Sequence, residues 1–189
     1  MAFLPNPKSR ALLFDVTRCV GCRECAKACK ASHEFHGTGE ETELDAATYT
    51  VVLDKGEDRY LRRMCMHCAD PSCVSACPVG AFTKTELGPV VYDADKCMGC
   101  RYCMIACPYG VRTFNWGEPS RPTPHETGMV AARPLGTVEK CTMCVHRLAE
   151  DQVPSCVWSC PAGARIFGDL NDPEARVVAL IRDRQGESL

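Results

Sequence analysis

Short apolar runs alternate along the chain with polar connections that are rich in glycine and proline. Their β-branched and aromatic residues predict strands at residues 12–16, 49–53, 60–64, 89–92, 112–116 and 164–167. The turn Lys55-Gly-Glu-Asp58 joins the second and third of these as a hairpin. Helices are expected at residues 24–33, 145–152 and 174–184, the last with Asp172 as N-cap and Pro173 in its first turn. This mixture of short elements predicts an α+β fold.

Sixteen cysteines are distributed along the chain in four sets of four. Sets one and three have the spacing C-x2-C-x2-C-x3-C, the middle gap of set two is widened to four residues, and that of set four holds eleven. A proline follows the last cysteine of sets two, three and four, whereas Lys30 follows that of set one. The sets are Cys19, Cys22, Cys25 and Cys29; Cys65, Cys68, Cys73 and Cys77; Cys97, Cys100, Cys103 and Cys107; and Cys141, Cys144, Cys156 and Cys160.

This spacing favours metal ligation over the alternatives. Cysteines at x2 spacing wrap the backbone around a metal group and turn its N–H groups toward the sulfur atoms, whereas disulfides join distant segments. Zinc ribbons use two C-x2-C pairs per metal and have no use for a third and fourth cysteine. Set three, which ends in Cys107-Pro108, has the spacing of bacterial ferredoxins, in which three thiolates hold one [4Fe–4S] cluster and the fourth reaches a neighbouring cluster. The chain is therefore predicted to hold four [4Fe–4S] clusters.

The connection between sets two and three has the length and layout of that in a two-cluster ferredoxin, so these sets are expected to exchange their fourth cysteines. Sets one and four remain and are expected to do the same. The predicted ligand groups are Cys19, Cys22, Cys25 and Cys160 (cluster A); Cys65, Cys68, Cys73 and Cys107 (cluster B); Cys97, Cys100, Cys103 and Cys77 (cluster C); and Cys141, Cys144, Cys156 and Cys29 (cluster D).

This pairing predicts two pseudo-symmetric, bacterial-ferredoxin-like modules, one inserted in the other. The outer module comprises residues 1–64 and 139–189, and the inserted module comprises residues 65–116. Residues 117–138 are rich in proline and glycine and are expected to form an extended surface loop.

Charge and hydropathy exclude several partners. The formal net charge is −2 with neutral cysteines, and four oxidised clusters with their thiolates would lower it to roughly −10. No basic field remains for nucleic acid. The longest uncharged aliphatic run, residues 177–181, is too short to span a bilayer, and the N-terminal residues carry no export signal.

With its four sets in place, the chain resembles the four-cluster electron-transfer subunits of the complex iron–sulfur molybdoenzymes, such as polysulfide, thiosulfate, tetrathionate and dimethyl sulfoxide reductases and formate dehydrogenase. The most specific matches are Cys65-Met-His-Cys-Ala-Asp-Pro-Ser-Cys73, Gly99-Cys-Arg-Tyr-Cys-Met-Ile-Ala-Cys-Pro-Tyr-Gly110, Glu139-Lys-Cys-Thr-Met-Cys144 and Ala164-Arg-Ile-Phe-Gly-Asp-Leu-Asn-Asp-Pro173. The resemblance implies a large molybdopterin catalytic subunit, with molybdenum or tungsten, and an integral-membrane quinone-reactive subunit as partners. It implies a soluble subunit attached to a membrane complex, with the cytoplasmic face favoured over the periplasmic face reached by co-export.

No nucleotide-binding glycine motif or catalytic triad is present, so the chain is expected to transfer electrons without catalysing a reaction of its own. A free-standing polyferredoxin is the first alternative, and clusters with a structural, regulatory or open-iron role are the second. His67 could modulate a cluster or sense protonation, but it is expected to be partly exposed and inert, as such residues more often are. Five cations lie beside ligands in the sequence, where each either favours the reduced cluster or is an ordinary solvated surface charge. They are Arg18, Arg23, Lys27, Arg101 and Lys140.

Overall fold

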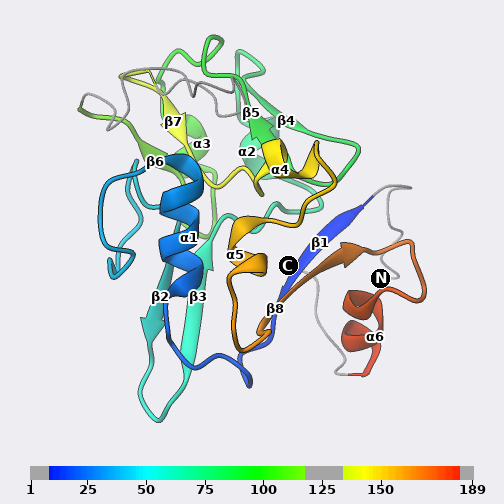
Figure 1. Cartoon of the computed structure of the whole chain (residues 1–189). Helices are drawn as coiled ribbons and strands as arrows, with labels where there is room; N and C mark the ends of the chain where they lie inside the picture. Colours follow the sequence, from blue (N-terminus) through cyan, green and yellow to red (C-terminus); the bar gives the residue numbers. More distant parts are fainter. Residues whose placement is uncertain (1–8, 118–133, 184–189) are drawn as a thin grey trace.

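The computed structural model describes residues 9–117 and 134–183, which form an α+β fold of short strands and short helices (Figure 1). The strands within these ranges pair into four two-stranded antiparallel sheets. The sheets are β1 (Arg10–Phe14) with β8 (Arg165–Asp169), β2 (Thr50–Asp54) with β3 (Tyr60–Met64), β4 (Phe82–Lys84) with β5 (Val90–Tyr92), and β6 (Thr113–Phe114) with β7 (Val138–Glu139).

Two helices of the described residues are longer than one turn. They are α1 (Glu24–His33), which packs against β2 and α5, and α6 (Arg176–Asp183), which packs against β8 (Figure 1). The one-turn helices of the described residues are α2 (Ser72–Ser75), α3 (Tyr102–Ile105), α4 (Val145–Leu148) and α5 (Ser155–Trp158). In each set the third cysteine lies in a helix, namely α1, α2, α3 and α5 in chain order. These four helices are therefore parts of the ligand segments.

The sheet of β1 and β8 joins the two ends of the described chain. Strand β1 precedes set one and β8 follows set four, and Leu12 and Leu13 pair with Phe167 and Ile166. Helix α6 covers this sheet, because its fully buried Val177 side chain packs against Gly168 of β8. Sets one and four are thereby brought together by segments about 150 residues apart in sequence.

Most predicted elements are confirmed. The bounds of α1 are as predicted, and the predicted hairpin forms with its first strand one residue later. The predicted helix at 145–152 is a single turn, and α6 begins at Arg176 because Asp172 caps a preceding turn instead, accepting the Glu174 N–H at 3.0 Å. Strand β4 was not predicted. Strand β7 begins at Val138, inside the predicted loop, of which residues 118–133 lie outside the described residues.

Lys30 explains why α1 continues past Cys29, where the other sets have proline. Its side chain is buried and its Nζ donates to the His36 and Ala47 carbonyls and to the Thr48 hydroxyl, each at 2.9 Å. Glu41 completes the site as an ion-pair partner at 3.3 Å. The helix therefore carries an anchor that holds the long connection between α1 and β2 in place.

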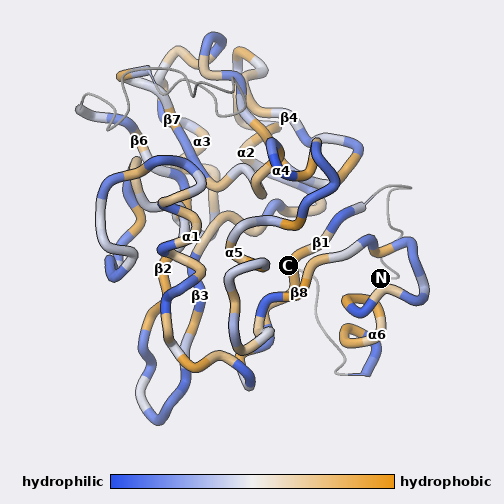
Figure 2. Tube along the Cα trace, viewed as in Figure 1, coloured by the Kyte–Doolittle hydropathy of each residue, from blue (hydrophilic) through white to orange (hydrophobic). Residues whose placement is uncertain are grey.

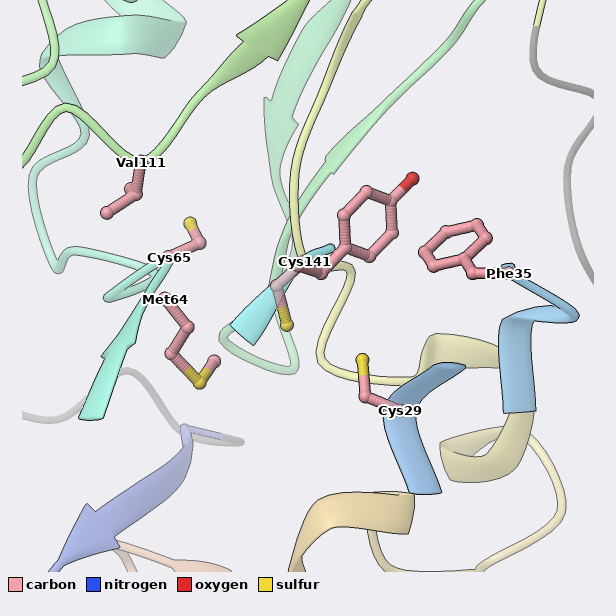
Figure 3. Packing of buried hydrophobic residues seen from close by; sticks show 7 residues of the cluster. Cys29, Phe35, Met64, Cys65, Val111 and Cys141 are labelled. Atoms are coloured by element: carbon pink, nitrogen blue, oxygen red, sulfur yellow. The ribbon is translucent and has the colours of Figure 1, made fainter. Parts of the chain in front are cut away.

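Within the described residues, much of the buried interior falls into three small apolar groups. One group combines Cys73 and Cys103 with Ala81, Phe82, Val90 and Val138, and another combines Cys25 and Cys156 with Val52. The third contains Cys29, Cys65 and Cys141 together with Phe35, Tyr49, Met64 and Val111 (Figure 3). The turn of the β2–β3 hairpin, by contrast, is hydrophilic (Figure 2). Cysteines thus occupy the interior positions that aliphatic residues hold in other folds.

Among the described residues, none of the helices has the length and apolar character needed to cross a bilayer.

Candidate metal centres

A left-handed residue stands immediately before the second cysteine of every set. The four residues have φ between 48° and 73°, a conformation that turns the ligand segment sharply. Two are glycines, whereas the other two have side chains and hold this conformation at a strain cost. The residues are Gly21, His67, Gly99 and Met143.

A second repeated feature follows the last cysteine. In sets two, three and four the chain continues as Cys-Pro-x-Gly, and each of these glycines has φ between 56° and 62°. The glycines are Gly80, Gly110 and Gly163. Set one has Ser32 at this position, inside α1. The four ligand segments therefore share one entry turn, and three of them share one exit turn.

Sets two and three meet within residues 65–107. Burial raises the pKa of the Cys68 thiol, and the neighbouring thiols of Cys65, Cys73 and Cys107 raise it further. Burial also raises the pKa of the Cys103 thiol to about 11, a rise that Arg112 opposes. The thiols that act on Cys103 are those of Cys97, Cys77 and Cys100. Each set therefore lies beside the last cysteine of the other.

Sets one and four meet in the same manner. Burial raises the pKa of the Cys29 thiol well above its usual value, and the next largest effects come from Cys141, Cys144 and Cys156 of set four. The sulfur atoms of Cys29 and Cys141 point toward one another (Figure 3). A small cavity of about 20 Å³ next to β1 and β8 is lined by the other group of thiols, Cys19, Cys22, Cys25 and Cys160.

The two pairs of sets also approach each other. Burial raises the pKa of the Cys141 thiol to about 12, and Cys65 of set two is among the neighbours that raise it further. Both residues belong to the apolar group of Figure 3. Cys22 and Cys100 are the two exposed cysteines of the sixteen, and they belong to sets one and three.

Three arginines donate to the thiols or lie beside them, and two of them, Arg112 and Arg165, are buried. The Arg165 Nη2 donates to Cys25 Sγ at 2.6 Å, and the Arg112 Nη2 donates to Cys73 Sγ. Arg62 Nη2 lies 4.0 Å from Cys156 Sγ. Burial would raise the pKa of the Cys156 thiol, but Arg62 and Arg165 lower it below its usual value. Sequence reasoning missed all three arginines.

The five cations expected from the sequence lie mainly at the surface. Arg18, Lys27 and Arg101 are exposed, and Arg23 is half-buried beside Glu40. Lys140 differs, because it is almost fully buried and its Nζ donates to the carbonyls of Val90 and Cys141. It thereby joins the β4–β5 hairpin to the start of set four.

The expectation that His67 is partly exposed is wrong, since only 6% of it is accessible. Its Nδ1 accepts the Val90 N–H at 2.9 Å, so the hairpin of β4 and β5 covers the imidazole. Burial lowers the pKa of His67 well below its usual value, and Lys140 and Lys84 lower it further. The imidazole is therefore neutral, with its remaining proton on Nε2.

Comparison with known proteins agrees with this arrangement. A family model described as a 4Fe-4S dicluster domain matches residues 56–121 and again residues 124–170. A Halobacterium salinarum protein that bears the name of a dimethyl sulfoxide reductase iron–sulfur subunit is 43% identical over 91% of this chain and 70% of its own length. The iron–sulfur cluster-binding subunit of menaquinone reductase from Nitratidesulfovibrio vulgaris is 38% identical, over 92% of this chain and 80% of its own.

A tetrathionate reductase subunit from Salmonella typhimurium is 37% identical over 95% of this chain and 66% of its own length. The chain belongs to the 4Fe-4S dicluster family. A two-cluster domain matched twice, together with sixteen cysteines, corresponds to four [4Fe–4S] clusters, as predicted. These relatives are named as subunits of reductases, which agrees with the expectation that the chain is not itself a catalytic subunit.

The residues present fit a dicluster protein. All sixteen cysteines are free thiols, and within the described residues no group of three or more His, Cys, Asp or Glu side chains could hold a single metal ion. Backbone N–H groups already face sulfur, as from Ala81 to Cys77 at 3.2 Å and from Met143 to Cys141 at 3.3 Å. Such donors stabilise the negative charge of a cluster. The raised thiol pKa values mean that protons leave these cysteines when iron binds.

Proposed function

We propose that this chain is the electron-transfer subunit of an oxidoreductase complex and that its four sets hold [4Fe–4S] clusters by exchanging their last cysteines. The observation that carries the proposal is the position of Cys29. After burial, the largest effects on the pKa of its thiol come from Cys141, Cys144 and Cys156 of set four, and Cys29 and Cys141 belong to one apolar group. The ligand groups are Cys19, Cys22, Cys25 and Cys160 (A); Cys65, Cys68, Cys73 and Cys107 (B); Cys97, Cys100, Cys103 and Cys77 (C); and Cys141, Cys144, Cys156 and Cys29 (D).

The same contacts support an order of the four groups. Groups A and D share sets one and four, groups B and C share sets two and three, and Cys141 of D and Cys65 of B belong to the same apolar group. The order is therefore A, D, B, C. Both exposed cysteines, Cys22 and Cys100, belong to the terminal groups. Each cluster, when bound, supplies a centre that accepts and releases one electron.

The chain's own residues serve this relay in two ways. Between groups B and D, the apolar side chains that surround Cys29, Cys65 and Cys141 exclude water. The terminal ligand segments instead carry exposed apolar side chains, namely Val20 and Trp158 near group A and Met98, Tyr102 and Ile105 near group C. Exposed apolar surface of this kind is typical of an interface with a partner protein.

Two modules support the relay. We assign residues 65–116 to an inserted module and residues 1–64 and 139–189 to an outer one. The repeated entry and exit turns support this pseudo-symmetry. The β1–β8 sheet joins the two separate segments of the outer module, and the β4–β5 hairpin lies within the inserted module. Strand β7 connects the two, because its Glu139 belongs to the outer module and pairs with Thr113 of β6 in the inserted module.

The names of the relatives support the choice of partners. A catalytic molybdopterin subunit is proposed on one side, since relatives are named as subunits of tetrathionate and dimethyl sulfoxide reductases. A quinone-reactive membrane subunit is proposed on the other, since another relative is a menaquinone reductase subunit. The chain then belongs to a complex attached to the membrane, and we favour the cytoplasmic face of the membrane over the periplasmic face. Co-purification of such subunits with a tagged chain tests the assignment, and a chain purified alone from its native membrane extract contradicts it.

Serine variants test the ligand groups. Anaerobically prepared chain is expected to contain about sixteen irons and four electron paramagnetic resonance signals after reduction. Cys29→Ser and Cys144→Ser should abolish the same signal, whereas Cys22→Ser abolishes a different one. Loss of the same signal in Cys29→Ser and Cys22→Ser would show that set one binds its own cluster and would overturn the exchange. About four irons in total, or zinc, would overturn the whole assignment.

A further inference from the structure

Two buried arginines occupy equivalent positions in the two halves of the chain. Arg112 is the fifth residue after Cys107 in Cys-Pro-Tyr-Gly-Val-Arg, and Arg165 is the fifth after Cys160 in Cys-Pro-Ala-Gly-Ala-Arg. Both side chains are more than nine-tenths buried, at 5% and 3% accessibility. In both halves, the exit turn with its left-handed glycine is therefore followed by an arginine whose side chain lies in the interior. Charged side chains are usually found at the surface, where water solvates them.

Each arginine contacts the third cysteine of the other set in its pair. Arg112, which follows set three, donates to Cys73 of set two, and Arg165, which follows set four, donates to Cys25 of set one. Each also acts on the third cysteine of its own set, which is Cys103 for Arg112. For Arg165 the corresponding residue is Cys156. Each guanidinium therefore stands between the two ligand groups of one module, B and C or A and D.

Both guanidinium groups retain donors that no other described residue accepts. Arg112 has unpaired Nε and Nη1 atoms, and Arg165 has an unpaired Nη1 atom, all fully shielded from solvent. Within the described residues neither arginine forms an ion pair with a carboxylate. A buried charge without an acceptor is strongly unfavourable, so the site requires an anionic partner. A thiolate-ligated cluster supplies both negative charge and sulfur acceptors at this place.

We propose that Arg112 and Arg165 are paired positioning residues, each of which raises the reduction potentials of both clusters in its own module and of neither cluster in the other. The inference rests on the ligand groups proposed above. A fixed positive charge favours the reduced, more negative form of a cluster, and hydrogen bonds to ligand sulfur act in the same direction. Because each arginine lies between two clusters, it shifts them together and so preserves the difference in potential across which the electron moves within a module.

The two arginines differ in what supports them. The Arg112 guanidinium lies 4.0 Å from the centroid of the Phe82 ring, and Phe82 occupies the equivalent fifth position after Cys77. Arg165 instead lies with a second arginine, Arg62, near Cys156. Aromatic stacking holds a guanidinium plane without neutralising it. The inserted module therefore has one arginine charge here, stacked on an aromatic ring, whereas the outer module has two arginine charges.

The test is a redox titration of holoprotein variants, followed by electron paramagnetic resonance. Arg165→Met should lower the potentials of the A and D signals, and Arg112→Met should lower those of B and C. We expect a roughly tenfold fall in the reduced-to-oxidised ratio of the shifted clusters at fixed potential, which corresponds to 59 mV for a one-electron couple. Arg165→Lys and Arg112→Lys keep the charge but lose the planar pair of donors, so they should recover part of the shift.

Iron content and a control separate the possible outcomes. Arg182→Met changes an exposed arginine on α6 and should shift no signal. Unchanged potentials in methionine variants that retain about sixteen irons would overturn the inference, as would a shift of a single cluster or of all four. If a methionine variant loses its clusters, the lysine variant decides, because it must still shift the same two signals. Fewer than four signals in the wild-type chain would instead show that the proposed ligand groups are wrong.

Discussion

The two proposed modules solve the same ligation problem by different routes. In the inserted module, called the inner module below, sets two and three are separated by the short β4–β5 hairpin, so their cysteines meet through contacts that are local in sequence. In the outer module, sets one and four meet only because β1 pairs with β8, and α1 packs against α5. Identical ligand chemistry thus places different demands on the rest of the chain. The inner module needs a tight turn, and the outer module needs long-range packing.

Set one shows this difference most clearly. The inner sets end in Cys-Pro and their helices stop after one turn, whereas α1 continues to His33 and uses Lys30 as a buried anchor. After the last cysteine of set one, the outer module therefore has the additional contacts of Lys30, whereas the chain turns away at the proline in the inner sets. Removing that extension should damage the outer module much more than changing a proline damages any other set.

Lys30→Pro should have the largest effect on stability. It places proline inside α1 and removes the three hydrogen bonds of the buried ammonium group, so we expect a loss of about 3 kcal/mol or more. Pro161→Ala is the matched control in set four and should cost less than about 1 kcal/mol. The measurement is anaerobic urea denaturation followed by circular dichroism. Equal midpoints for the two variants would contradict the distinct role of α1.

The entry turns give a second comparison. Gly21 and Gly99 are equivalent, and alanine would be strained at both because φ is near 70°. A Cβ at Gly99 would collide with the backbone carbonyl of Gly136, whereas at Gly21 it would meet the Tyr60 ring, which can shift. Gly99→Ala should therefore cost about 2–3 kcal/mol and Gly21→Ala about 1 kcal/mol. The same denaturation experiment ranks them, and the reverse order would show that Tyr60 cannot move.

His67 occupies the same entry turn in set two and offers a smaller effect. His67→Leu should destabilise by about 1–3 kcal/mol, because the buried Val90 N–H loses its acceptor. His67→Asn should cost less, since asparagine tolerates the left-handed conformation and its Oδ1 can replace Nδ1. Thermal unfolding under anaerobic conditions compares the two. Equal losses would mean that ring packing, and not the hydrogen bond, holds the β4–β5 hairpin over set two.

Sequence reasoning succeeded where the pattern is local and failed where burial decides. The four cysteine sets could be predicted from their spacing. Helix α1 could be predicted because it lies between Cys22 and the polar connection that follows His33. Strands β4 and β7 contain three and two residues, too few for a periodic pattern. The buried arginines were missed because neither Arg112 nor Arg165 is adjacent to a cysteine, and a single charged residue taken alone predicts a solvated surface position. The repeated Cys-Pro-x-Gly-x-Arg was the available signal, since both copies place the arginine at the same distance from a ligand.

Arg101 provides the last and smallest comparison. It directly follows a ligand, Cys100, yet it is exposed and its guanidinium stacks 4.9 Å from the Trp116 ring and 5.3 Å from the Phe114 ring. Solvent screens such a charge, so Arg101→Met should shift the cluster C potential by much less than the removal of Arg112 does. Redox titration of both variants at two salt concentrations checks this, because only the small Arg101 effect should shrink further at high salt. A larger shift from Arg101→Met would mean that sequence proximity to a ligand outweighs burial in setting the potential.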